Sequence, residues 1–404
     1  MKSKLNHIEL FAGCGGLSLG LEGAGFHLVL ANELSPMAAE TFAYNFFNED
    51  LEELAMQQQR PTKTLWLNSR FESLKPRLRE NPFDFPSHDD TGYSDIPNDL
   101  YELNGKLIVG SITELNRLLD SSAEASVAFK EALGSNGLDL VSGGPPCQSF
   151  SMAGKREKNN DKNTLPWEFA KFVDHCKPKI ALLENVTGIL RPFKDEHGEH
   201  FHAWYEVAKV FASIDYIPLC LHINARNMGI AQNRPRFIMI AIREDFLSSI
   251  HARLSDAEQK LFDEPLSFHK LVAMHGKHLP FGHLNFVDLI KPPSEYSIEN
   301  TFLAPLFGRP ETSVKDAIDD LKTHEPSLRS RFVDDLNTTF PMLEPRPEVF
   351  NHELRNNSPI VKRRFRIYQI LQTIGSRSIS KAVFQVLKGD SDIISNEVWQ
   401  ALSV

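Results

Sequence analysis

The chain has 404 residues, of which 41% are hydrophobic, and a net charge of −9. This length predicts two or three domains with a sizeable core, and no apolar run approaches the ~18 residues that a membrane span requires. Because the whole chain is acidic, any binding of nucleic acid would have to depend on local basic patches.

The chain opens with a pattern typical of a nucleotide-binding turn. Residues 7–11 predict a strand, which runs into a glycine-rich turn at 12–16 and then into apolar residues at helical spacing. The glycines let a ligand approach the backbone, and the start of the helix offers free N–H groups. The dinucleotide fingerprint fails, because Ser18 stands where its third glycine would be.

A second predicted strand, at residues 28–31, leads to Glu33. A carboxylate at this distance from the glycine turn suits the two hydroxyls of a ribose, although a solvated acid is the alternative. A third strand is expected at 107–110. The intervening residues 51–106 are rich in Pro, Asn and Asp, and we expect an insertion that lies on the surface with little core of its own.

The segment 143–151, GGPPCQSFS, follows a short predicted strand at 138–141. Two successive prolines restrict φ twice and remove two backbone donors. They therefore place Cys147 on a stiff corner at the carboxyl end of a strand, where open α/β sheets bind ligands. Its thiol is a candidate nucleophile, although a lone cysteine is more often a buried structural residue.

Two further segments carry charges next to predicted strands. A strand at 180–183 is followed by Glu184-Asn185-Val186, and the segment 232–236, QNRPR, leads into an apolar strand at 237–242. Taken singly, Glu184 and the two arginines could be ordinary solvated charges.

Together and in this order, these segments resemble the DNA cytosine-5 methyltransferases. The matching stretches are FAGCGG at 11–16, PPCQSFS at 145–151, ENV at 184–186 and QNRPR at 232–236, within residues 5 to about 245. The resemblance implies an α/β fold with the doubly wound, mixed sheet of S-adenosylmethionine-dependent methyltransferases. Residues 1–245 would form the catalytic domain, with the insertion at 51–106, and residues 246–404 a smaller, partial target-recognition region.

The same resemblance implies transfer of a methyl group from S-adenosyl-L-methionine to C5 of a cytosine that is flipped out of double-stranded DNA. Cys147 would add covalently to C6 and thereby make C5 nucleophilic. Glu184 would hold a proton toward N3, and Arg236 would contact the cytosine O2 and orient Cys147. Arg234 and Gln232 would organise this wall of the site.

The cofactor contacts are also implied by the resemblance. Phe11 would stack on the adenine, and Glu33 would bind the ribose. At the end of the third strand the family usually has an Asp, whereas this chain has Ser111, a shorter and neutral acceptor. The full set of expected cofactor residues is Phe11, Ala12, Gly13, Gly15, Gly16, Glu33, Leu34, Ser111, Ile112, Pro146 and Leu165.

Two charged segments have open interpretations. The polar residues 151–163 resemble the mobile lid over the flipped base, with a solvated loop as the alternative. Residues 358–374 predict an amphipathic helix in a stretch, 355–381, that has no acidic residue. Its basic side chains either contact phosphates or form an ordinary solvated face.

The chain departs from the family after residue 245. We find neither the Arg-rich segment that braces the recognition region nor the closing Gln-x-Gly-Asn segment with its final helix. We therefore expect a split enzyme whose second chain supplies these motifs, a truncated product, or a recognition region that has been repurposed. An RNA cytosine-5 methyltransferase and a non-catalytic DNA-binding subunit are the alternative functions.

The expected setting is the cytoplasm of a prokaryote or a phage-infected cell, at the nucleoid, within a restriction-modification or defence system. The four cysteines are scattered without metal-ligand spacing, which favours a reducing compartment and predicts no metal site. The first residues lead directly into a predicted strand, so no signal peptide is expected.

Overall fold

The computed structural model forms two compact units, Met1–Leu343 and Glu344–Val404. The residues that it describes are 5–87, 92–121, 127, 129–131, 137–146, 164–194, 200–291, 298–322, 328–340, 355–392, 396 and 400. Cys147 and the expected lid at 151–163 lie outside these ranges. Within them, no helix combines the length and the hydropathy of a membrane span.

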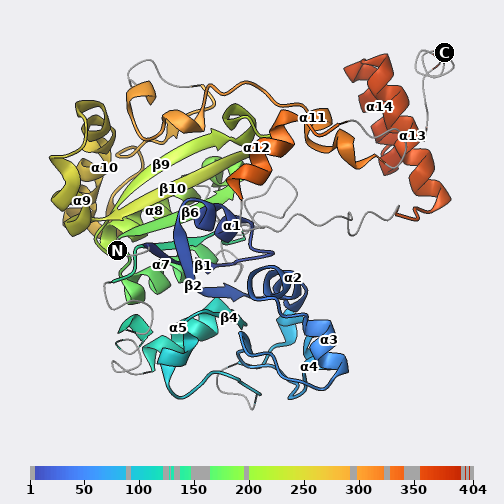
Figure 1. Ribbon diagram of the computed structural model, residues 1–404. Coiled ribbons are helices and arrows are strands. Elements are labelled where there is room, and N and C mark those ends of the chain that lie inside the picture. Colours follow the sequence, from blue (N-terminus) through green and yellow to red (C-terminus); the bar gives the residue numbers. More distant parts are fainter. Residues whose placement is uncertain are drawn as a thin grey trace. The chain divides into compact units, whose positions relative to one another are not determined.

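The larger unit is built on one mixed sheet, whose described strands have the order β11-β9-β10-β6-β5-β1-β2-β4-β3 (Figure 1). The strands β3, β4, β2, β1, β5 and β6 are mutually parallel, and β10 runs antiparallel to β6 and β9. This arrangement confirms the predicted doubly wound fold. The bounds are β1 (Leu5–Leu10), β2 (Phe26–Glu33), β3 (Thr64–Trp66), β4 (Lys106–Val109), β5 (Leu140–Gly143), β6 (Ile180–Val186), β9 (Tyr216–Asn224), β10 (Pro235–Arg243) and β11 (Val287–Asp288).

Each predicted strand is present, but some ends differ. The strand expected at 138–141 begins two residues later, as β5. The strands expected at 180–183 and 237–242 are longer, so that Glu184 and Arg236 lie inside β6 and β10. The apolar pattern does not reveal this extension, because the backbone ladder between β6 and β10 continues past the hydrophobic residues.

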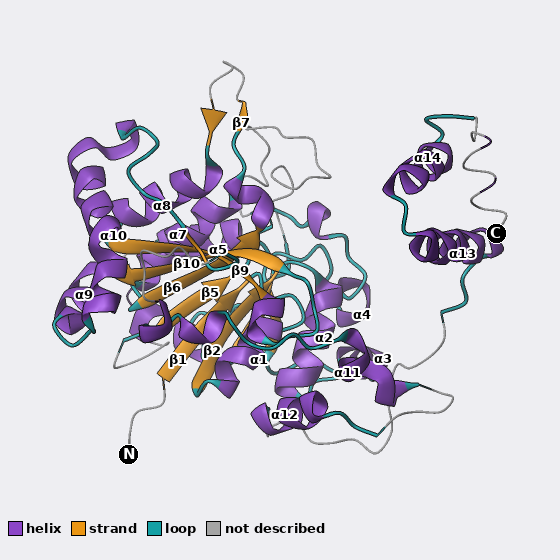
Figure 2. Cartoon of the chain, turned by 90° about the horizontal axis from the view of Figure 1, so that it is seen from above, coloured by secondary structure: helices purple, strands orange, loops and turns teal. Residues whose placement is uncertain are grey.

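Helices cover both faces of this sheet (Figure 2). In β2, Leu30 belongs to one core cluster and Ala31 to another, since successive side chains of a strand point to opposite faces. The first cluster includes residues of α5 (Ile112–Asp120), α7 (Leu165–Cys176) and α8 (Ala203–Ser213). The second includes residues of α2 (Pro36–Phe47) and α3 (Leu51–Met56). The described residues of this unit also form α1 (Gly16–Gly23), α4 (Leu74–Arg77), α9 (Glu244–His251), α10 (Asp256–His275), α11 (Val314–Ile318) and α12 (Arg331–Thr339).

The expectation of a surface insertion with little core at 51–106 is wrong. Leu51, Trp66 and Leu78 are all at most 3% exposed and pack in one cluster with residues of β2 and β4. β3, which lies in this segment, extends the sheet by pairing with β4. The burial follows from tertiary pairing, because the edge of the sheet offers an apolar surface that these scattered side chains complete.

The smaller unit contains α13 (Pro359–Ile374) and α14 (Arg377–Lys388). The predicted helix at 358–374 is thereby confirmed. Leu371 and Val383 are buried between the two helices, and the rings of Tyr368 and Phe384 lie 5.7 Å apart. Phe365, an apolar residue of α13, remains 52% exposed.

Candidate active site

A cavity of about 430 Å³ lies at the carboxyl ends of β1, β2, β4 and β5. The strand order reverses between β1 and β5, and such a switch point is where open α/β sheets bind ligands. The cavity is lined by Phe11, Asn32, Glu33, Leu34, Ser35, Pro82, Phe83, Gly110, Ser111, Ile112, Gly144, Pro146 and Leu165.

Most of the expected cofactor residues meet at this cavity. The ones that line it are Phe11, Glu33, Leu34, Ser111, Ile112, Pro146 and Leu165. Ala12, Gly13, Gly15 and Gly16 form the adjoining turn instead. Asn32, Ser35, Gly110 and Gly144 were not predicted, although each lies within two residues of a predicted position. Pro82 and Phe83 were not predicted either, and the local sequence carries no signal for them.

Glu33 holds the glycine turn in place. Its carboxylate accepts hydrogen bonds from the backbone N–H groups of Gly13 (2.7 Å) and Ser35 (2.8 Å). Burial raises the pKa of Glu33. Since each carboxylate oxygen has two acceptor positions, these bonds leave capacity for a ligand hydroxyl. Gly13 has φ of +55° and Phe11 of +54°, so the chain turns sharply beside the cavity.

A second carboxylate supports the turn from within the sheet. Glu9, in β1, is 3% exposed and accepts hydrogen bonds from the backbone N–H (2.9 Å) and the hydroxyl of Ser18. Burial is the largest influence on Glu9 and raises its pKa to about 7, although the bonds from Ser18 oppose this rise. The pair connects the first turn of α1 to the central strand, a role that the sequence analysis did not assign to Ser18.

Glu184 and two arginines form a charged wall beyond the cavity. The Nε of Arg236 donates to Oε1 of Glu184 at 2.5 Å, and the guanidinium of Arg234 lies 3.7 Å from the same oxygen. The antiparallel register of β6 and β10 creates this contact. It places Ile238 opposite Glu184 and Arg236 opposite Val186, so Arg236 is a diagonal neighbour of Glu184 on the same face of the sheet. Gln232 is exposed, and among the described residues its side chain makes no hydrogen bond to Glu184.

The cavity and the charged wall meet at residues 144–146. A Cβ at Gly144 would lie 3.1 Å from Oε2 of Glu184, so the backbone passes close to the carboxylate. Asn185 donates from Nδ2 to the carbonyl oxygen of Pro145 (3.1 Å) and holds this segment against β6. A group bound in the cavity and a second reactant at Glu184 would therefore be neighbours.

The chain is similar to known proteins. The model of a family described as C-5 cytosine-specific DNA methylase matches residues 5–66 and 99–366. The chain is 27% identical over 241 residues to the type II methyltransferase M.DdeI of Desulfomicrobium norvegicum, which covers 60% of this chain and 41% of that protein. It is 28% identical over 243 residues to the type II methyltransferase M.Sau96I of Staphylococcus aureus, covering 60% and 40%. The match thus spans about two fifths of each relative's length.

Among solved structures, a mutant of DNMT2 from Spodoptera frugiperda is similar with a TM-score of 0.34 and 15% identity, covering 60% of this chain and 51% of that one. A similarity at this level is too low to support an inference about function.

Proposed function

The chain belongs to the C-5 cytosine-specific DNA methylases, and from this premise we propose that it transfers a methyl group from S-adenosyl-L-methionine to C5 of cytosine in duplex DNA. The observation that supports this best is the junction at residues 144–146, where the cavity adjoins the pair of Glu184 and Arg236. It offers one place for a small cofactor and, beside it, one place for a polar base.

The cavity has residues that fit the cofactor. Its volume is in the range of small-molecule sites, Phe11 offers an aromatic face, and the Glu33 carboxylate can accept from ribose hydroxyls. Bound there, S-adenosylmethionine would supply a methyl group on a sulfonium. The Ser111 hydroxyl accepts from the N–H of Thr113 (3.2 Å) as the N-cap of α5, which leaves one lone pair of this neutral group for an adenine amino group.

In the proposed reaction, the Cys147 thiolate adds to C6 of the flipped cytosine, and C5 becomes nucleophilic and accepts the methyl group. Loss of the C5 proton and release of Cys147 from C6 then restore the ring. Cys147 lies outside the described residues, so its role rests on the segment 144–146 that leads to it. The hydrogen bond from Arg236 keeps the Glu184 carboxyl group in place. In the proposed reaction this carboxyl group holds a proton toward N3 of the base. We propose that Arg234 and Gln232 support this wall. We also propose that residues 1–245 form the catalytic domain and that residues 246–404 contribute to DNA recognition.

Duplex DNA that contains 5-fluorocytosine tests the covalent step. With S-adenosylmethionine present, C5 receives the methyl group but carries fluorine in place of the proton whose loss would release Cys147, so the protein should stay bound to the DNA as an adduct that survives denaturing electrophoresis. The Cys147→Ala variant should form none, whereas Cys14→Ala should still form it, since Cys14 is the exposed thiol of the described residues. An adduct of equal yield with Cys147→Ala would refute the proposed nucleophile.

Labelled methyl transfer tests the substrate. Duplex DNA should accept the methyl group and transfer RNA should not; the reverse result would favour an RNA methyltransferase, and no transfer to either would favour a binding subunit.

The need for a second chain stays a prediction. Turnover of the purified chain on the order of one per second or faster would contradict it.

A further inference from the structure

One wall of the cavity comes from a segment that the family model does not match. The matched ranges end at residue 66 and resume at 99, whereas Pro82 and Phe83 line the cavity together with Glu33 and Ser111. Both belong to η1 (Pro82–Asp84), a single 3-10 turn. The residues between 67 and 98 thus bring an aromatic side chain to a site built mainly from strand ends and the start of α7.

The segment is closely attached to the sheet beside the cavity. The N–H of Leu67 donates to the carbonyl oxygen of Val109 (2.9 Å), which extends the pairing of β3 with β4. A Cβ at Gly110 would lie 2.8 Å from the Cβ of Leu67, so only glycine permits this approach. Ser69 and Tyr93 exchange two backbone hydrogen bonds, of 3.0 and 2.7 Å, and close the base of the excursion.

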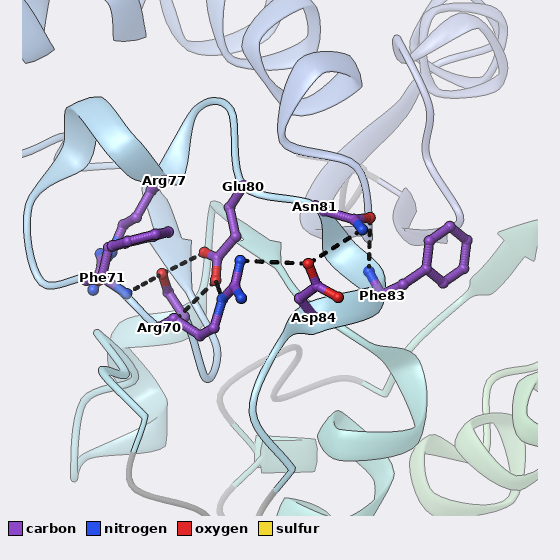
Figure 3. Close-up of polar contacts among 8 residues, drawn as sticks. Arg70, Phe71, Arg77, Glu80, Asn81, Phe83 and Asp84 are labelled. Carbon is purple, nitrogen blue, oxygen red and sulfur yellow. Dashed lines mark hydrogen bonds and ion pairs between the residues drawn. The ribbon is translucent and has the colours of Figure 1, made fainter.

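A buried carboxylate organises the interior of the segment (Figure 3). Glu80 is 5% exposed and accepts from the hydroxyl of Ser69 (2.6 Å), and from the backbone N–H (2.9 Å) and Nε (3.3 Å) of Arg70. Buried charges are retained where they are paired and hydrogen-bonded in this way. The arrangement fixes the direction in which the Arg70 side chain extends.

The network of hydrogen bonds and ion pairs around Glu80 extends to Phe83. Arg70 forms an ion pair with Asp84 at 3.5 Å, and Nδ2 of Asn81 donates to Asp84 at 3.3 Å. The side-chain oxygen of Asn81 accepts from the backbone N–H of Phe83 (3.2 Å). The turn is therefore held on both sides, and in Figure 3 the Phe83 ring extends away from the Arg70–Glu80 pair.

The Phe83 residue is 70% exposed although the turn that carries it is well supported. An aromatic ring at the edge of a cavity can gain contact area by stacking on a planar group of a ligand. Among the residues that line the cavity, Phe11 offers one aromatic face to a planar base. The ring of Phe83, which comes from a different segment, can add a second aromatic contact.

We propose that Phe83 is a cofactor-binding residue, which stacks on the adenine of S-adenosylmethionine, and that residues 67–98 serve to position it. This inference rests on the proposed function, because it takes the cofactor from there. Phe83 acts on binding and not on methyl transfer, since it lies on the cavity wall and not at Glu184.

Calorimetry with S-adenosylhomocysteine, the demethylated product, tests the proposal. Phe83→Ala should raise the Kd about tenfold, the range for loss of one base–aromatic stack, and Phe83→Tyr should restore binding. Phe71→Ala is the matched control, because Phe71 belongs to the same segment but lines a different hollow. An unchanged Kd for Phe83→Ala would overturn the proposal while leaving the proposed function intact. A wild-type chain that does not bind S-adenosylhomocysteine would overturn both.

Two further readouts separate binding from a merely structural role. In the methyl-transfer assay, Phe83→Ala should raise the KM for S-adenosylmethionine and leave kcat nearly unchanged, as expected for loss of uniform binding. Asn81→Ala keeps the ring but removes its support, so a smaller rise in Kd is expected. Equal losses of thermal stability and of binding in Phe83→Ala and Phe83→Tyr would show that the residue only maintains the fold.

Discussion

At the scale of single residues, two buried carboxylates hold the glycine turn from opposite sides. Glu33 accepts from Gly13 within the turn, and Glu9 accepts from Ser18 where α1 begins. Burial raises the pKa of both. Ionisation of either group therefore has an energetic cost in the native state that it does not have in the unfolded chain.

This cost predicts a pH dependence of stability. The pKa of Glu9 is about 7 in the native protein and 4.5 for an ordinary glutamate, so the native state binds the proton more tightly. The stabilisation is complete below the unfolded pKa and is lost as the pH rises through 7, with a total of about 3 kcal/mol for the shift. Glu33 acts with the same sign.

Urea unfolding at several pH values between about 5 and 8 measures this effect. The free energy of unfolding of the wild-type chain should fall more steeply with rising pH than that of Glu9→Gln, which cannot ionise. The exposed Glu53→Gln variant should follow the wild type. Parallel curves for wild type and Glu9→Gln would contradict the prediction.

At the scale of elements, the site depends on how closely β5 approaches its neighbours. Gly143 lies opposite Leu10 of β1, and a Cβ there would be 2.7 Å from the carbonyl oxygen of Leu10 and 2.8 Å from the ring of Phe169. Backbone and a buried ring cannot easily move apart. The glycine thus allows the strand that precedes Cys147 to pack between β1 and α7.

We expect Gly143→Ala to lower the free energy of unfolding by about 1–3 kcal/mol, the usual effect of overpacking. Gly20→Ala is the control: apart from the backbone of its own helix, no atom lies within 4 Å of its would-be Cβ in α1, so it should be neutral or stabilising by up to about 1 kcal/mol. Thermal denaturation of both variants decides the matter. Two similar melting temperatures would show that the sheet relaxes around the added methyl group.

At the scale of the whole molecule, charge is unevenly distributed. The chain has a net charge of −9, yet residues 355–388 contain eight Lys and Arg and no Asp or Glu. Most of this charge lies on α13 and α14, where Arg363 and Arg364 are exposed. A basic surface of this kind attracts phosphates despite an acidic total.

We therefore predict that the double variant Arg363→Gln/Arg364→Gln binds DNA more weakly at every sequence. Fluorescence anisotropy at a series of salt concentrations should also show a smaller salt dependence, by about 0.9 in the logarithmic slope for each phosphate that the protein no longer neutralises. The pair Arg253→Gln/Lys270→Gln removes the same charge from exposed positions on or beside α10. If both pairs behave alike, the basic helices form only a solvated face.

The sequence alone determined which strands lead into the cavity. The residues at 11, 33, 111 and 146 each follow or end an apolar strand, and the carboxyl ends of parallel strands share one edge of a sheet. They therefore meet in one cavity. Local patterns were sufficient for the strands, the glycine turn and Glu33, because hydrophobic periodicity and glycine punctuation are properties of short segments. The cofactor roles of Phe11, Ser111 and Pro146 were implied by the resemblance to the family.

Only the tertiary structure decided which distant residues join this site. The contact of Arg236 with Glu184 depends on the register of β6 and β10, and the burial of Trp66 depends on β3 pairing at the far edge. Phe83 reaches the cavity because an insertion folds back over Gly110. Such contacts follow from strand order, register and long-range packing, which the period of side chains along one segment does not encode.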